Sequence, residues 1–147
     1  MNDFPILLVE DNPDDAFLMQ RAWKTAGVTQ RLEVVEDGQQ AIAYLERSRQ
    51  AEAGPATLPL FVLLDLKLPH RSGFEVLEWI RTDSTCRTLL VIVLTSSSER
   101  RDIERCYQLG ANSYLVKPSE AKQLADLAGC LKQYWINHNA PPPLRQG

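Results

Sequence analysis

Five short apolar runs, separated by segments of helical periodicity, constrain the fold of this chain more than any other feature of its sequence. The runs are rich in Val, Leu and Ile, as are strands buried on both faces of a sheet. They are FPILLVE (4–10), RLEVVE (31–36), LFVLLD (60–65), LLVIVLT (89–95) and SYLVK (113–117). The segments that follow them carry apolar residues on one helical face, most clearly Leu124, Leu127, Ala128 and Leu131. This alternation predicts an α/β fold of the (βα)5 type, a doubly wound, five-stranded parallel sheet with helices on both faces.

Composition and charge exclude several classes of protein. With 147 residues, the chain has the size of one globular domain that can bury its own core. Its 16 Lys and Arg against 19 Asp and Glu give a net charge of −3 without a basic run, so nucleic-acid binding is not expected. Cys86, Cys106 and Cys130 are widely spaced, which predicts reduced thiols rather than disulfides or a zinc site. The sequence shows neither a membrane span nor a signal peptide, so we expect a cytoplasmic protein.

Candidate site residues stand at the ends of four of the five apolar runs. Glu10 and Asp11 follow the first, Asp65 the third, Thr95 the fourth and Lys117 the fifth. In an open parallel sheet, ligands bind outside the carboxyl ends of the strands. Three carboxylates, a hydroxyl and an ammonium group are therefore expected to meet at one edge of the sheet.

Four motifs at these strand ends resemble those of the receiver domain of two-component response regulators. In order and spacing they are VEDN (9–12), LLDLKLP (63–69, followed by SGFEVL), VLTSS (93–97) and YLVKP (114–118). The resemblance covers about residues 4–136 and implies the flavodoxin-like strand order 2-1-3-4-5. The opening EDNPDD (10–15) and a long insertion before the third strand are similar to single-domain regulators that pair with phytochrome-type histidine kinases.

The resemblance implies a phosphoacceptor and a metal site. Asp65 would attack a phosphohistidine of a partner sensor histidine kinase and form an aspartyl phosphate. Mg²⁺, or Mn²⁺ in its place, would be held directly by Asp11, Asp65 and the backbone carbonyl of Lys67, with Glu10 acting mainly through water. The metal would neutralise both the acidic site and the incoming phosphoryl group.

The remaining strand-end residues are expected to bind the phosphoryl group and to respond to it. Lys117 would give one phosphoryl oxygen a charge-assisted hydrogen bond, and the Thr95 hydroxyl would bond another. Movement of Thr95 would leave space into which Tyr114 turns as a switch, with the fourth helix, fifth strand and fifth helix as the readout face. The resemblance also implies a cis peptide bond between Lys117 and Pro118.

Several features depart from the family pattern or have simpler explanations. The cation of Lys67, close to Asp65, could block an attacking water, which predicts slow autodephosphorylation. The surplus residues RSRQAEAGPATLP (47–59) predict a solvent-exposed loop after the second helix. Asp14 and Asp15 lie in the first turn of a helix capped by the preceding Asn and Pro, where carboxylates complement the helix dipole without further purpose.

The end of the chain predicts a receiver domain at 1–136 and a flexible tail at 137–147, because the prolines of NHNAPPPLRQG end helical structure. Trp135 and Ile136 extend an apolar stripe beyond the last predicted helix. They either support a homodimer through the fourth helix, fifth strand and fifth helix, or pack back on their own domain.

The sequence therefore predicts a single-domain response regulator that signals by protein contacts or by phosphorelay and catalyses only its own phosphorylation and dephosphorylation. Two alternatives stay open. One is a phosphohydrolase of the haloacid dehalogenase type, although Lys67 stands where that family has a second Asp. The other is a flavodoxin-like binding module that does not depend on phosphorylation, although no phosphate-binding loop follows the first strand.

Overall fold

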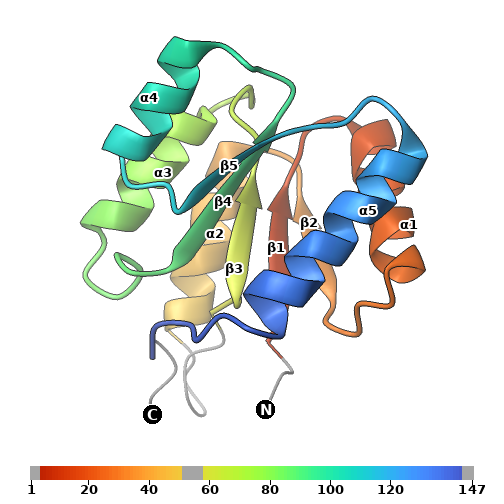
Figure 1. The fold of residues 1–147 in the computed structure, drawn as a ribbon. Coiled ribbons are helices and arrows are strands. Elements are labelled where there is room, and N and C mark those ends of the chain that lie inside the picture. The colour runs from red at the N-terminus through yellow and green to blue at the C-terminus, as the bar shows by residue number, and fades with distance from the viewer. Residues whose placement is uncertain (1–3, 51–57, 144–147) are drawn as a thin grey trace.

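A five-stranded parallel sheet forms the centre of the molecule (Figure 1). The computed structural model describes residues 4–50 and 58–143. The strands lie in the order β2-β1-β3-β4-β5, which confirms the predicted (βα)5 fold and its strand order. The elements along the chain are β1 (Ile6–Val9), α1 (Pro13–Thr25), β2 (Leu32–Val35), α2 (Gly38–Arg49), β3 (Phe61–Leu64), α3 (Gly73–Thr82), β4 (Leu90–Thr95), α4 (Arg100–Gln108), β5 (Ser113–Val116), α5 (Ala121–Leu131) and a π-helical turn, η1 (Lys132–Ile136).

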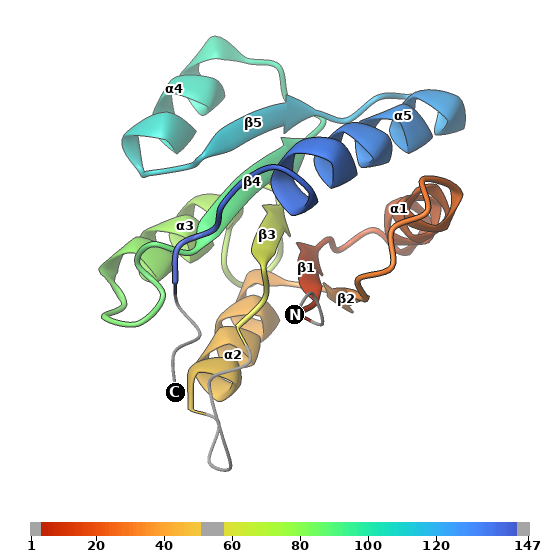
Figure 2. The same ribbon diagram turned by 60° about the horizontal axis from the view of Figure 1, so that its bottom comes forward.

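Helices cover both faces of this sheet, as the alternation of strands and helices predicts. Figures 1 and 2 show α1 and α5 side by side on one face, with α2 and α3 on the other. Two apolar clusters fill the layers between. Alternate residues of β1 point into opposite clusters: Ile6 and Leu8 face α1 and α5, whereas Leu7 and Val9 face α2 and α3. The three inner strands are thereby buried on both sides, which explains why their sequences are continuously apolar.

Capping hydrogen bonds hold the first turns of α1 and α3, the helices that follow β1 and β3. The side chain of Asn12 accepts hydrogen bonds from the backbone N–H groups of Asp14 and Asp15, and Pro13 opens the helix. Ser72 and Glu75 form a reciprocal capping box at the start of α3. Gly73 lies so close to the end of β3 that a Cβ atom there would come within 2.2 Å of the Asp65 carbonyl oxygen. A side chain at residue 73 would therefore displace the strand end that carries Asp65.

The segment at 47–59 differs from its prediction at both ends. Helix α2 continues to Arg49 and buries Ser48, and the Leu58 side chain is fully buried in the α2–α3 cluster. Residues 47–49 and Leu58 are therefore not part of a solvent-exposed loop; on the helical side, no Gly or Pro interrupts the pattern after Gly38 until Gly54. Residues 51–57 lie outside the described residues.

The C-terminal turn η1 folds back onto the domain. Trp135 and Ile136 pack against the α1–α5 cluster, so their apolar surface is used within one chain. Tyr134 is exposed, and its ring meets that of Trp135 edge to face at a centroid distance of 4.9 Å. The tail predicted for 137–147 stays a prediction. Within the described ranges, no helix is both long and apolar enough to cross a membrane.

Candidate functional site

Three carboxylates meet at the carboxyl edge of the sheet, as the strand-end pattern predicts. Glu10 and Asp11 follow β1, and Asp65 follows β3, its direct neighbour in the sheet. One carboxylate oxygen of each residue lies within 4.8 Å of the others. Glu10 and Asp65 are buried, whereas Asp11 is exposed. The cluster therefore opens to solvent on the side of Asp11.

Backbone N–H groups orient two of these carboxylates. The N–H of Leu66 donates to Oδ1 of Asp65 at 2.7 Å, and the N–H of Asn12 donates to Oε2 of Glu10 at 3.1 Å. Both side chains are thus held by the segments that leave their own strands. Because each of these bonds uses one oxygen, the second oxygen of each carboxylate remains available for a cation.

Lys117 supplies that cation from the end of β5. Its Nζ lies 3.0 Å from Oδ2 of Asp65 and also bonds Oε1 of Glu10. These two bonds and the nearby negative charges raise the pKa of Lys117 above its ordinary value, although burial of the ammonium acts in the opposite direction. Lys117 is therefore a permanent positive charge in the site at neutral pH.

The surroundings of Glu10 oppose the ionisation of its carboxylate. Burial raises the pKa of Glu10, and the charge of Asp65 raises it further. The hydrogen bonds from Lys117 and from the Asn12 backbone act against this rise without cancelling it. A second cation near Glu10 would stabilise its charged form, as expected for a site made to hold a metal.

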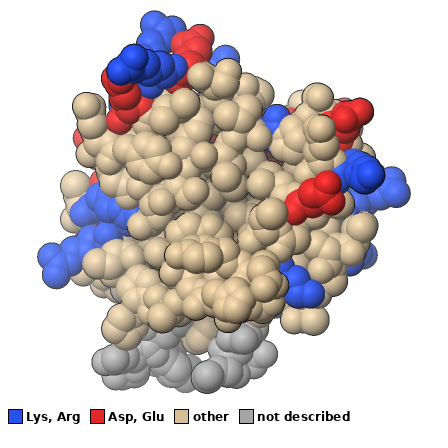
Figure 3. Space-filling model, viewed as in Figure 1, with Lys and Arg blue, Asp and Glu red and all other residues tan. Residues whose placement is uncertain are grey.

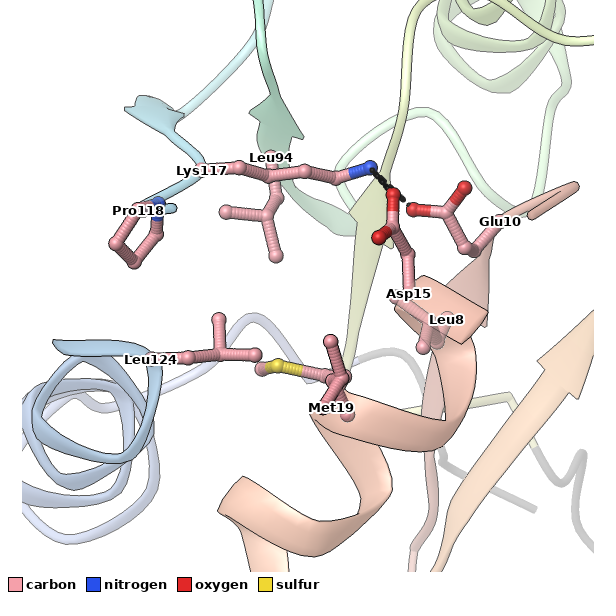
Figure 4. A pocket seen from close by; sticks show the side chains of 9 residues that line it. Leu8, Glu10, Asp15, Met19, Leu94, Lys117, Pro118 and Leu124 are labelled. Atoms are coloured by element: carbon pink, nitrogen blue, oxygen red, sulfur yellow. Dashed lines mark hydrogen bonds and ion pairs between the residues drawn. The ribbon is translucent and has the colours of Figure 1, made fainter. Parts of the chain in front are cut away.

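Asp15 belongs to the site, contrary to the interpretation of the sequence. Its Oδ2 lies 3.2 Å from Nζ of Lys117 (Figure 4). Asp15 was expected only to complement the dipole of α1. Its place in the first turn of the helix that follows Glu10 and Asp11 was the available signal, but the sequence does not show which way that turn faces. For Asp14, the interpretation as a first-turn carboxylate is unchanged.

Thr95 and Tyr114 lie on the β4–β5 side of the site. Thr95 is buried at the end of β4, and its carbonyl accepts from the Lys117 backbone N–H at 2.8 Å. The ring of Tyr114 is half-buried against the cluster of Leu66, Val93 and Cys106. Its hydroxyl donates to the Ser97 carbonyl at 2.9 Å. Burial raises the pKa of the Tyr114 hydroxyl, so it remains a donor at neutral pH.

Lys67 is exposed and lies at the rim of a hollow beside the carboxylates. The hollow is further lined by Leu66, Phe74, Ser96, Ser97, Ser98, Glu99, Arg101 and Asp102. Lys67 is two residues from Asp65 in the sequence, so this hollow lies next to the segment that carries Asp65.

The predicted cis bond before Pro118 is wrong. Across residues 4–50 and 58–143 every peptide bond is trans. The trans form of an X-Pro bond is favoured by about 0.5–1 kcal/mol, and Lys117 reaches the carboxylates of Glu10 and Asp65 from this trans backbone.

The donor set fits Mg²⁺ or Mn²⁺. These ions take oxygen ligands in octahedral geometry, keep several waters and need only one or two protein carboxylates. Asp11 and Asp65 offer such oxygens, and the open side of the cluster leaves room for waters. The presence of three carboxylates against one permanently charged lysine leaves negative charge that a divalent ion would balance.

Comparisons with known proteins agree with this geometry. The family model of the response regulator receiver domain matches residues 6–128. The probable methanogenesis regulatory protein FilR2 of Methanothrix harundinacea is 42% identical over 95% of this chain and 88% of its own length. Response regulator Rcp1 of Synechocystis sp. is 35% identical, with 89% and 88% covered. These relatives are regulators, and they give no support to a phosphohydrolase or a phosphorylation-independent module.

Two solved structures show the same fold with the ligands that the site predicts. The phosphorylated cyanobacterial phytochrome response regulator RcpA has a TM-score of 0.83 and 35% identity, covering 94% of this chain and 97% of that one. The Mn²⁺-bound form of Rcp1 has a TM-score of 0.80 and 34% identity, covering 93% and 97%. This chain therefore belongs to the family of response regulator receiver domains, and it is a Mg²⁺-binding, phosphorylation-accepting signalling protein rather than a metabolic enzyme.

Proposed function

We propose that Asp65 is the residue that accepts the phosphoryl group from a phosphohistidine of the partner histidine kinase. The observation that carries this proposal is the position of the Asp65 carboxylate, which has an oxygen within 4.8 Å of the other two acids and lies 3.0 Å from the Lys117 ammonium. Asp65 also leaves the central strand β3, with a neighbouring strand on each side. Glu10 is more deeply buried and Asp11 is exposed, so Asp65 is the acid that combines partial access with a fixed orientation.

The transfer forms one bond and breaks one. An oxygen of Asp65 attacks phosphorus, the phosphorus–nitrogen bond of the phosphohistidine breaks, and the electron pair returns to the imidazole nitrogen. Lys117 gives a charge-assisted hydrogen bond to a phosphoryl oxygen, and the Thr95 hydroxyl bonds another. Thr95 ends β4 and Lys117 follows β5, at the same edge of the sheet as Asp65, so both need only local movement.

We assign the metal to Asp11, Asp65 and the Lys67 backbone carbonyl, with Glu10 acting through water. When bound, the divalent ion neutralises the carboxylates and the phosphoryl oxygens, which would otherwise repel one another. Leu66 and Asn12 hold the carboxylates through their backbone N–H groups and so limit the cost of bringing the ligands together.

The output of phosphorylation is a change in the surface made by α4, β5 and α5. Thr95 ends β4, the strand between β3, which precedes the acceptor, and β5, which carries Tyr114, so a shift of Thr95 would be passed on to the β5 side of the sheet. Figure 3 supports a protein-binding role for this face, because few charged side chains lie between α4 and α1 in that view. Tyr107 on α4 and Val116 on β5 are exposed apolar residues of this surface.

For the upstream partner we propose a phytochrome-type histidine kinase. The support is the likeness to RcpA, described as a phytochrome response regulator, over nearly the whole of both chains. Such a kinase would act in the cytoplasm, and the net charge of −3 favours a protein partner over nucleic acid. A homodimer through α4, β5 and α5 stays a prediction; it now depends on Tyr107 and Val116, because Trp135 and Ile136 pack within their own chain.

The acceptor is tested with acetyl phosphate and Mg²⁺, followed by intact-mass measurement. The wild type should gain one phosphoryl group, and Asp65→Asn should gain none. Asp14→Asn is the matched control, because Asp14 is a neighbouring exposed carboxylate whose bond to the Asn12 cap is made by the backbone N–H and is kept in the variant; this variant should be phosphorylated normally. Phosphorylation of Asp65→Asn to the wild-type extent, or failure of the wild type with both acetyl phosphate and a kinase, would refute the assignment.

A further inference from the structure

We propose that Asp15 is a positioning residue that holds Lys117 in the unphosphorylated protein and releases it when a phosphoryl group arrives. The inference rests on the proposed function of Asp65 and Lys117 and deepens it. Through Asp15, helix α1 would influence the equilibrium between the unphosphorylated and the phosphorylated protein.

The observation is an ion pair between two elements that are far apart in sequence. Asp15 lies in the first turn of α1, and Lys117 leaves β5 toward α5. Figure 4 shows the two side chains pointing toward one another, with Oδ2 of Asp15 3.2 Å from Nζ of Lys117. The contact therefore ties α1 directly to the cation of the phosphorylation site.

The hydrogen-bonding capacity of Lys117 is full in this state. A lysine ammonium has three N–H donors and no acceptor. The acceptors that face it are Oε1 of Glu10, Oδ2 of Asp15 and Oδ2 of Asp65. When Asp65 accepts a phosphoryl group it loses its own carboxylate charge, so a phosphoryl oxygen that bonds Lys117 competes with the two partners that stay ionised, Glu10 and Asp15.

Burial decides which of the two carboxylates that stay ionised, Glu10 or Asp15, yields its bond to Lys117 more easily. The side chain of Glu10 is 3% exposed and that of Asp65 is 10% exposed, whereas that of Asp15 is 44% exposed. A buried carboxylate that loses its cation pays for desolvation, but water can rehydrate the carboxylate of Asp15. Asp15 is therefore the partner with the smallest cost of release.

The apolar side chains beneath Lys117 do not favour a movement of its ammonium group away from the carboxylates. Its aliphatic stem passes over a small cavity lined mainly by apolar side chains, among them Leu94, Met19 and Leu124 (Figure 4). This cavity has little to offer an ammonium group in exchange for a carboxylate. Lys117 consequently stays at the acidic edge, and the exchange takes place between Asp15 and the phosphoryl oxygen.

This arrangement predicts that Asp15 opposes the phosphorylated state. Its carboxylate competes for Lys117 and adds negative charge beside the entering anion. Removing the charge should favour a bound phosphoryl group by about three- to fivefold, the size expected of one partly exposed ion pair. The gain should shrink at high ionic strength, because salt screens such pairs.

The test measures the affinity of beryllofluoride, a phosphoryl analogue, by titration calorimetry at saturating Mg²⁺. Wild type, Asp15→Asn, Asp15→Glu and Asp14→Asn are compared, with the affinity for Mg²⁺ measured separately. Asp14→Asn removes the same charge from the same helical turn without a Lys117 contact. We expect tighter binding in Asp15→Asn, near-wild-type binding in Asp15→Glu and no change in Asp14→Asn.

Three results would overturn the inference while leaving Asp65 as the acceptor. They are equal affinities in Asp15→Asn and Asp14→Asn, weaker binding in Asp15→Asn, or a gain explained entirely by tighter Mg²⁺ binding. A wild type that is phosphorylated at a residue other than Asp65 would instead remove the proposed function itself.

Discussion

The hydroxyl of Tyr114 is hydrogen-bonded to the carbonyl oxygen of Ser97, at 2.9 Å, and this bond joins β5 to the loop between β4 and α4. The hydroxyl of the same serine donates to Oδ2 of Asp102 in α4 at 2.6 Å. Tyr114, Ser97 and Asp102 thus connect the strand, the loop and the helix of the proposed readout face. A shift of Thr95, two residues before Ser97, would strain this connection.

Removing the Tyr114 hydroxyl should loosen the loop. In Tyr114→Phe, the half-buried Ser97 carbonyl loses its donor, so the free energy of unfolding should fall by about 1 kcal/mol. Hydrogen exchange should become faster in residues 96–99. Tyr107→Phe is the control, because that side chain is exposed on the neighbouring helix. Equal stability and equal exchange in the two variants would contradict a structural role for the Tyr114 bond.

The metal site predicts a specific loss in Asp11→Asn. This substitution removes a charge from the exposed side of the carboxylate cluster while keeping the size of the side chain. Mg²⁺ affinity should fall about tenfold or more, because carboxylate charge is the main contribution of the protein to such a site. Calorimetric titration with Mg²⁺ measures this, with Asp14→Asn as the control of equal charge. Similar losses in both variants would show only a general effect of surface charge.

Lys117 should stabilise the protein most when no metal is present. Lys117→Ala leaves the buried carboxylates of Glu10 and Asp65 without their cation, which should lower the free energy of unfolding by about 3 kcal/mol. Mg²⁺ should restore part of this loss, since a ligand that binds the folded state stabilises it. Thermal unfolding with and without Mg²⁺ tests this against the exposed control Lys122→Ala. A deficit in Lys117→Ala that Mg²⁺ leaves unchanged would contradict the shared neutralisation of these acids.

The sequence predicts the sheet and the strand-end cluster because both depend on residues that are adjacent in the chain. In a parallel sheet, all strands have their carboxyl ends at the same edge. That edge therefore carries the residues that follow β1, β3 and β5, which are Glu10, Asp65 and Lys117. Asp15 could not be placed in this way, because its contact depends on the rotation of α1 against β5. That rotation is set by the packing of many side chains between α1 and α5.

The same reason explains why the ends of two elements could not be decided from the sequence. Ser48 is polar yet buried, so the end of α2 could not be read from polarity. The sequence indicates that the apolar side chains of Trp135 and Ile136 are buried, but it does not show against what. In the structure both residues belong to the π-helical turn η1 and pack against the core of their own domain. Tertiary packing, rather than local propensity, determined each of these outcomes.

Lys67 predicts a long-lived phosphoryl group. Lys67 is exposed, lines the hollow and stands two residues after the acceptor, so its cation is expected to hinder an approaching water. Lys67→Asn should shorten the lifetime of the phosphorylated protein by about threefold, a change expected of one exposed charge. Lys67→Arg keeps the cation and should keep the lifetime. Intact mass, followed over time after removal of acetyl phosphate, gives both values, and an unchanged lifetime in Lys67→Asn would exclude this role.

Alkaline pH should destabilise the fold through Cys106. Burial raises the pKa of its thiol to about 11 from an ordinary value of 9.0. Between these values the unfolded chain releases a proton that the folded chain keeps, so this contribution to stability is present below pH 9 and is lost as pH rises to 11. The slope should approach about 1.4 kcal/mol per pH unit for this one group. Urea unfolding from pH 8 to 11 should show a shallower fall in Cys106→Ala, whatever its stability at pH 8, whereas the exposed control Cys130→Ala should keep the wild-type slope. Parallel curves for wild type and Cys106→Ala would place the alkaline loss in other groups.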